Sequence, residues 1–225
     1  LDYVVTKMPR FPFDKFSSAN NKLSTQMKAT GEVMSVGRTI EESLLKAARS
    51  LEIGVNHLYM KKFESFSDDE MLSYIKDGTD DRIYAVAELL RRKTDIGMIC
   101  NATKIDMLFL EKIKNIVKTE NRLREHIGDT DTLYTAKKLG FSDEFIGKLW
   151  GMTGEEIYKI REKRGMFPVY KMIDTCASEF ESYIPYFYST YEDENESVVS
   201  DKKKIIVLGS GPIRIGQGVE FDYST

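Results

Sequence analysis

The chain has few residues of the kinds that build metal centres, disulfide frameworks and nucleophilic sites. Its 225 residues include 2 cysteines, Cys100 and Cys176, and 2 histidines, His57 and His126. Two cysteines are too few for a disulfide framework, so we expect reduced thiols. Neither histidine has a second His or Cys at ligand spacing, so no metal site is predicted. No Ser-His-Asp or Cys-His set is apparent, and we predict no catalytic residue in this chain.

The sequence also lacks a strong net charge and a long apolar run. Its formal net charge is −3, from 33 basic and 36 acidic residues. This balance gives no electrostatic reason to expect nucleic acid or an anionic membrane surface as a partner. No apolar run approaches the roughly 20 residues of a membrane span, and the N-terminal residues lack the basic segment of a signal peptide. We therefore expect a cytoplasmic protein with no membrane and no nucleic-acid partner.

What the chain does have is the composition of a globular protein in three blocks. Apolar residues make up 41% and charged residues 31%, a balance that can bury a core. The length suits one large or two small domains. The pattern divides the chain into an α/β segment over residues 1–60, a helical segment over residues 61–200, and a strand with a glycine-rich loop over residues 201–225.

In the first block, the N-terminal residues 1–6 have strand composition, and Pro9 and Pro12 are expected to interrupt it. A second short strand is expected between Gly31 and Gly37. Thr39 and Glu42 have the spacing of a capping box, in which the two side chains accept hydrogen bonds from the first amides of a helix. That helix is expected to bury one apolar face and to end at Gly54.

The second block reads as helices joined by short polar turns. Capping boxes are expected at residues 67–70 and 153–156. Helices are predicted from residue 68 to before Gly78, from Asp80 or Asp81 to about residue 93, and over 106–127, 131–139, 142–149 and 154–164. The long helix is predicted to bury a stripe that includes Phe109 and Ile127. Residues 167–174 return to strand composition, and the acidic run 192–196 is expected to be an exposed linker.

The third block begins with Ile205–Leu208, an apolar run that predicts a strand buried on both faces. Glycines follow at positions 209, 211, 216 and 218, and this order is typical of nucleotide-handling α/β domains. However, Arg214 stands where a dinucleotide fingerprint needs its third glycine, and no Gly-Lys-Ser/Thr of a P-loop follows. Because a doubly buried strand needs neighbours and no further strand follows, we expect this chain to be a segment of a longer protein.

Two other interpretations of the residues stay open. The helix pair expected over residues 143–150 and 155–164 resembles a helix-turn-helix, with Arg161, Lys163 and Arg164 as a basic end. Basic residues in a last turn also favour the helix dipole, which explains them without nucleic acid. A small dinucleotide-binding enzyme is the second alternative, and it would require a sheet of three or more parallel strands.

Several runs resemble one family, the carbamoyl-phosphate synthase large subunit. The similar runs are Asp2-Tyr-Val-Val-Thr-Lys-Met-Pro-Arg-Phe11, Met27-Lys-Ala-Thr-Gly-Glu-Val-Met34, Tyr170-Lys-Met-Ile-Asp-Thr-Cys-Ala-Ser-Glu-Phe180, Tyr188-Ser-Thr-Tyr191 and Gly211-Pro-Ile-Arg-Ile-Gly-Gln-Gly-Val-Glu-Phe-Asp-Tyr223. They occur in order and cover both ends and the junctions. Residues 61–166 resemble the family mainly in length and helical character.

The resemblance implies a mainly α fold: a helical oligomerisation-domain bundle with short α/β remnants at both ends. Residues 1–60 would be the tail of the carboxyphosphate-forming ATP-grasp half, 61–200 the oligomerisation domain, and 201–225 the start of the carbamoyl-phosphate-forming half. The family makes carbamoyl phosphate for arginine and pyrimidine biosynthesis, uses ATP with Mg or Mn, and receives ammonia from a glutaminase small subunit. Its ATP and metal ligands would lie upstream of Leu1 or downstream of Thr225. We therefore assign no cofactor to this segment and expect it to be inactive alone, serving as a spacer and a surface for self-association.

The resemblance also suggests where a passage for carbamate would run. Ser18, Gly218 and Glu220 are the candidate tunnel-lining residues. Gly218 has no side chain, so its backbone can border a passage without filling it. Glu220 would supply a carboxylate nearby. Ser18 departs from the glycine of relatives, which puts its part of this assignment in doubt.

Overall fold

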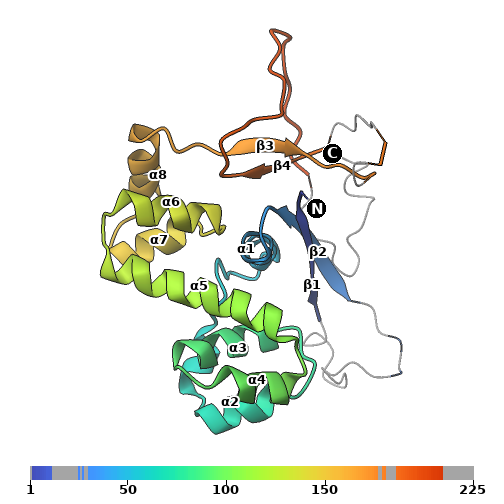
Figure 1. Cartoon of the computed structure of the whole chain (residues 1–225), viewed down its shortest axis with the longest axis vertical. Coiled ribbons are helices and arrows are strands. Elements are labelled where there is room, and N and C mark those ends of the chain that lie inside the picture. The colour runs from blue at the N-terminus through green and yellow to red at the C-terminus, as the bar shows by residue number, and fades with distance from the viewer. Residues whose placement is uncertain are drawn as a thin grey trace. The chain divides into compact units, whose positions relative to one another are not determined.

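The structure is a computed structural model that describes residues 2–11, 25, 27, 30–176, 179–180 and 186–209 (Figure 1). Within these residues the fold is mainly helical with two small antiparallel sheets, which confirms the predicted fold class. The chain divides into two compact units built from separate stretches of sequence. The first unit includes Leu1–Thr6, Ser35–Lys46 and Thr119–Val207, and the second includes Lys7–Met34 and Ala47–Lys118.

The first sheet pairs β1 (Val4–Arg10) with β2 (Gly31–Gly37). Buried and more exposed residues alternate along β2, as they do on a pleated strand with one covered face. The predicted position of β2 is confirmed. Pro9, which was expected to interrupt the extended segment, lies inside β1 instead. Each strand of a two-stranded sheet has a free edge, where the missing N–H of a proline removes no ladder hydrogen bond.

The helix α1 (Ile40–Ser50) begins with only half of the predicted capping box. The Glu42 N–H donates to Thr39 Oγ1 at 3.1 Å. The Glu42 carboxylate, however, accepts the N–H of Arg38 at 2.7 Å, one residue before the position that a capping box requires. The helix also ends before Gly54, because Glu52 already adopts a left-handed conformation with φ 52°.

In the second unit, a short 3-10 helix η2 (Lys61–Ser65) precedes α2 (Asp68–Tyr74), α3 (Arg82–Arg91), α4 (Ile96–Thr103) and the first part of α5 (Met107–Glu125). The Ser67 capping box is complete, as predicted. The core of the second unit contains fully buried side chains from every one of these helices: Phe63, Met71, Tyr84, Leu89, Ile99 and Leu110. The helix α4 was not predicted, because its residues show no clear apolar period and it begins at a plain Asp95 cap.

In the first unit, the rest of α5 is followed by α6 (Thr130–Lys138), α7 (Asp143–Trp150) and α8 (Gly154–Lys163), each where the sequence predicts it. The Trp150 indole donates to the Leu123 carbonyl at 2.8 Å and so ties the end of α7 to the end of α5. The second sheet pairs β3 (Val169–Met172) with β4 (Phe187–Thr190), with Val169 opposite Thr190. The strand β4 was not predicted.

Three predictions of burial are wrong. Phe109 is 49% exposed, because it lies in the first turn of α5 away from the buried Leu110 and Ile113. Ile127 is 61% exposed and follows the last residue of α5. Ile205–Leu208 forms no strand, and Ile205 is 92% exposed. A buried strand needs partner strands, and the described residues offer none to this segment.

Candidate functional site

Three residues are predicted from the family resemblance to line a passage for carbamate. Ser18, Gly218 and Glu220 all lie outside the described residues. Their shared role therefore stays a prediction. Two networks of polar side chains in the first unit are formed by other residues.

A cluster of buried charges joins the three short helices of the first unit. Arg161 of α8 donates from Nε to Asp143 Oδ1 at 3.0 Å and from Nη2 to Asp143 Oδ2 at 2.6 Å. Lys137 of α6 donates to the same carboxylate at 2.8 Å and to the Phe141 carbonyl at 2.7 Å. Both cations also lie over the ring of Tyr191, at 5.2 Å for Lys137 and 5.6 Å for Arg161. Arg161 and Lys137 thus hold α6, α7, α8 and Tyr191 together.

This geometry sets the charge states of the cluster. Burial would raise the pKa of the Asp143 carboxyl, but hydrogen bonds and charges from Arg161 and Lys137 outweigh burial and hold that pKa below its ordinary value. Burial likewise opposes the charge on Arg161, but Asp143 raises the pKa of the guanidinium. The cluster therefore keeps its ion pairs at neutral pH.

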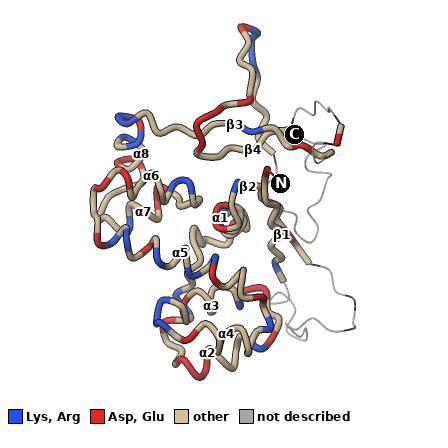
Figure 2. Tube along the Cα trace, viewed as in Figure 1, with Lys and Arg blue, Asp and Glu red and all other residues tan. Residues whose placement is uncertain are grey.

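The cluster bears directly on the helix-turn-helix interpretation. The helices α7 and α8 do form a close pair, with Gly151 at φ 70° in their connection. Arg161, one of three basic residues proposed to face nucleic acid, is 6% exposed and bound to Asp143. Basic and acidic positions are interspersed along the helices of each unit (Figure 2). This geometry gives no support to the nucleic-acid alternative.

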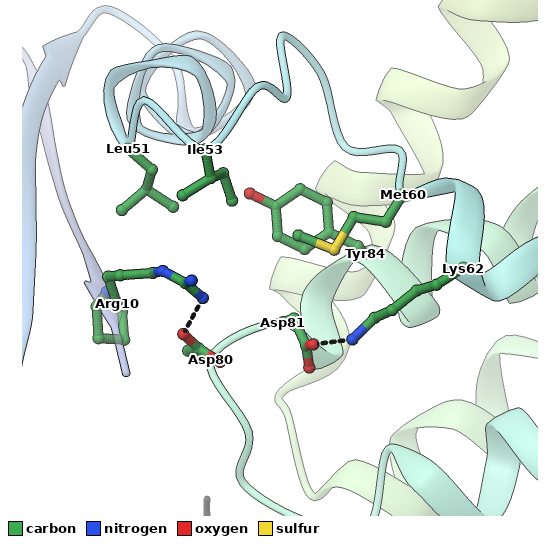
Figure 3. Close-up of a pocket in the computed structure, with 9 residues that line it drawn as sticks. Arg10, Leu51, Ile53, Met60, Lys62, Asp80, Asp81 and Tyr84 are labelled. Carbon is green, nitrogen blue, oxygen red and sulfur yellow. Dashed lines mark hydrogen bonds and ion pairs between the residues drawn. The ribbon is translucent and has the colours of Figure 1, made fainter. Parts of the chain in front are cut away.

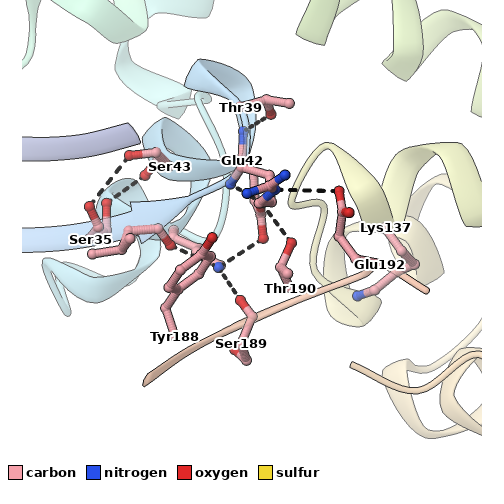
Figure 4. A network of polar contacts seen from close by, with 12 residues as sticks. Ser35, Thr39, Glu42, Ser43, Lys137, Tyr188, Ser189, Thr190 and Glu192 are labelled. Carbon is pink, nitrogen blue, oxygen red and sulfur yellow. Dashed lines mark hydrogen bonds and ion pairs between the residues drawn. The ribbon is translucent and has the colours of Figure 1, made fainter. Parts of the chain in front are cut away.

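A second polar network surrounds Glu42, whose residue is 1% exposed (Figure 4). Besides the Arg38 N–H, its carboxylate accepts the Thr190 hydroxyl at 3.0 Å and pairs with Lys46 Nζ at 2.8 Å. Lys46 also donates to the Val36 carbonyl at 2.9 Å and to the Ser189 carbonyl. One buried ion pair therefore joins the end of β2, the start of α1 and the strand β4.

The turn after α6 packs against the same helix start. Gly140 has φ +88°, and a Cβ there would lie 2.8 Å from the Glu42 Cα. Only glycine allows this approach of two backbones. Glu42 is therefore held on one side by Thr190 and covered on another by Gly140.

These networks position structural elements and contain no convergent nucleophile and base. Among the described residues, no group of three or more His, Cys, Asp and Glu side chains could hold a metal ion. Nor does any described helix have the length and apolarity needed to cross a membrane.

Two protein-family models match parts of this chain. Residues 32–165 match the model of the carbamoyl-phosphate synthetase large chain, oligomerisation domain. The chain belongs to this family. Residues 201–225 match the carbamoyl phosphate synthase preATP-grasp domain. The resemblance seen in the sequence is thereby confirmed, and both networks described above begin inside the oligomerisation-domain match.

The helix α5 begins with exposed apolar side chains. Met107, Leu108 and Phe109 are consecutive large apolar residues, and they are 40%, 54% and 49% exposed. Met98 of α4 is 52% exposed in the same unit. We call Met107–Phe109 the α5 apolar segment. Contiguous exposed apolar residues of this kind mark interaction sites more often than isolated ones do.

Sequence reasoning missed the contacts of residues 188–191. Its one signal was the Tyr188-Ser-Thr-Tyr191 run, which carried part of the family resemblance. The structure shows that Ser189 and Thr190 contact Lys46 and Glu42, while Tyr191 contacts Lys137 and Arg161. Such contacts join residues at least 30 positions apart and leave no local pattern.

Proposed function

We propose that this chain is the assembly and spacer segment of the large subunit of a carbamoyl-phosphate synthase. The complete enzyme would be an ATP-dependent carbon–nitrogen ligase of the cytoplasm. It would make carbamoyl phosphate from bicarbonate and glutamine-derived ammonia, for arginine and pyrimidine biosynthesis. The family match over residues 32–165 supports this proposal.

The exposed α5 apolar segment is the observation that carries the assembly role. We propose that it contacts a second copy of the chain, because the matched family model is described as an oligomerisation domain. A stable interface buries about 800 Å² on each partner, and three or four side chains supply only part of that area. We therefore expect the association of this chain alone to be weak.

The catalytic parts of the function are assigned to other regions of the enzyme. ATP and Mg or Mn would be bound by the two ATP-grasp halves, and ammonia would come from the glutaminase small subunit. The match of residues 201–225 to the preATP-grasp domain supports a position directly before the second half. Ser18, Gly218 and Glu220 remain our proposal for lining a carbamate passage in the complete enzyme.

Sedimentation velocity over a wide concentration range tests the assembly role. The wild-type chain should show a sedimentation coefficient that rises with concentration, and Leu108→Glu should reduce this rise because it places a charge in the apolar contact. Ile127→Glu is the matched control, since Ile127 is also apolar and exposed but lies outside the α5 apolar segment.

Two results would contradict the proposal. A strict monomer at every concentration would remove self-association of this chain and favour a contact between the α5 apolar segment and another part of the large subunit. Equal effects of the two substitutions would show that association uses a different face.

A further inference from the structure

The second unit contains a small cavity that the proposed function does not use (Figure 3). Its volume is about 140 Å³, and its apolar wall is formed by Pro9, Leu51, Ile53 and Met60. An apolar cavity of roughly 150 Å³ holds one benzene-sized molecule. This partly open cavity therefore has room for about one six-membered ring.

The charged side chains at the cavity are paired with one another. Asp80 accepts the Phe11 N–H at 2.6 Å and Arg10 Nη1 at 3.4 Å. Asp81 accepts the hydroxyls of Tyr74 at 2.6 Å and Thr79 at 2.9 Å, and it pairs with Lys62. A charged ligand would have to break one of these pairs to find a counter-charge, which costs more than a surface pair returns. The cavity thus favours an uncharged molecule.

One polar group points into this space without a strong partner. Tyr84 is 1% exposed, and Figure 3 shows its hydroxyl directed toward the region that Leu51 and Ile53 border. Within the described part of the chain, its hydrogen-bond contact is Met8 Sδ at 4.0 Å, and a thioether is a weak acceptor. A buried hydroxyl normally has an oxygen or nitrogen partner. Burial and the nearby charges of Asp80 and Asp81 raise the pKa of Tyr84, so the hydroxyl keeps its proton to donate.

We propose that this cavity binds a small uncharged molecule that has an apolar ring or branched body and one carbonyl or hydroxyl oxygen. The oxygen accepts a hydrogen bond from Tyr84, and the apolar body fills the space between Leu51, Ile53 and Met60. The cavity lies wholly inside the second unit. Its lining does not include the residues of the α5 apolar segment.

A pair of isosteric probes tests the assignment by NMR titration of the whole chain. Cyclohexanone carries the acceptor, and methylenecyclohexane replaces that oxygen by a CH₂ group. Cyclohexanone should shift the methyl resonances of Leu51, Ile53 and Met60 saturably and should bind more tightly than methylenecyclohexane. Tyr84→Phe removes only the hydroxyl and should weaken cyclohexanone roughly five- to tenfold, which is the effect of one lost hydrogen bond. It should leave the affinity for methylenecyclohexane unchanged.

Two further variants test whether the probes bind in this cavity. Ile53→Phe keeps the hydroxyl but fills the cavity, so both probes should lose binding. Tyr134→Phe, on α6 of the other unit, should change neither affinity. Equal affinity of the wild-type chain for the two probes, an unchanged cyclohexanone affinity in Tyr84→Phe, or binding that survives Ile53→Phe would each overturn the proposal.

Discussion

Two ion pairs in this chain have the same spacing and the same length but opposite surroundings. Glu42–Lys46 and Glu155–Lys159 are both i,i+4 pairs at 2.8 Å, and both glutamates lie in the first turns of their helices. The Glu42 side chain is 1% exposed, whereas that of Glu155 is 75% exposed. We expect Glu42→Gln to lower the free energy of unfolding by about 2–4 kcal/mol, because it leaves the Lys46 charge without its buried partner.

Glu155→Gln is the control for that substitution, and urea unfolding measures both. An exposed pair contributes little, since water screens its charges and holding the two side chains costs entropy. If both variants unfold at the same urea concentration, Glu42 does not hold β4 and α1 together in the way described.

The lowered pKa of Asp143 predicts how the free energy of unfolding should depend on pH. Its pKa is lowered in the folded chain, so its contribution to stability is complete above the unfolded-state pKa of about 4. This contribution is lost as the pH falls through the lower, folded-state value. Asp143→Asn should be about 2–4 kcal/mol less stable at neutral pH, since it strands Lys137 and Arg161. Urea unfolding at a series of pH values should show the gap narrowing below pH 4, and a constant gap would contradict the assignment.

At the scale of elements, two turn glycines allow the stability cost of a positive φ to be measured apart from the cost of a steric clash. Gly140 and Gly151 both have positive φ, but a Cβ at Gly151 meets nothing within 4 Å, whereas at Gly140 it meets the Glu42 backbone. Gly151→Ala should cost about 1 kcal/mol of stability for conformation alone. Gly140→Ala should cost about 1–3 kcal/mol more, because α1 and the turn must move apart. Thermal unfolding of the two variants checks this, and equal losses would mean that the close approach is not rigid.

Elements that carry their own boundary signals could be predicted from the sequence. The boxes at Ser67 and Thr153 satisfy amides three residues away, so a local pattern is enough to find α2 and α8. The strand β4 could not be found in this way, because its partner β3 lies at least 15 residues earlier and sets its register. Glu42 shows the same limit within a box: the spacing is right, but Thr190 and Lys46 compete for the carboxylate.

At the scale of the whole molecule, short sequence segments were enough to recognise the family. They were not enough to predict the polar networks around Glu42 and Asp143. The resemblance pointed to Ser18, Gly218 and Glu220, but the charge clusters of Glu42 and Asp143 depend on contacts that only a folded chain brings together. Arg161 illustrates the difference. In sequence it reads as the basic end of a recognition helix, and in the structure it is 6% exposed on Asp143.

The chain as a whole should neither bind Mg-ATP usefully nor hydrolyse it. On the proposed function, the residues that bind the phosphates and the metal would belong to the ATP-grasp halves of the complete enzyme. Isothermal titration with Mg-ATP should therefore give no binding heat in the micromolar range. A micromolar dissociation constant would show that this segment contributes directly to a nucleotide site.

The long reach of residues 188–190 has a consequence for synthesis on the ribosome. Thr190 bonds to Glu42, and Tyr188 donates to the Asp2 carbonyl, so the first unit closes contacts 148 and 186 positions apart. Translation proceeds at about 5–20 residues per second, so Glu42 must wait several seconds or more for its distant hydroxyl. Residues 47–118 emerge as one continuous stretch and have no such delay. We therefore expect residues 47–118 to fold on the ribosome before Thr190 and Tyr188 can make their contacts with Glu42 and Asp2.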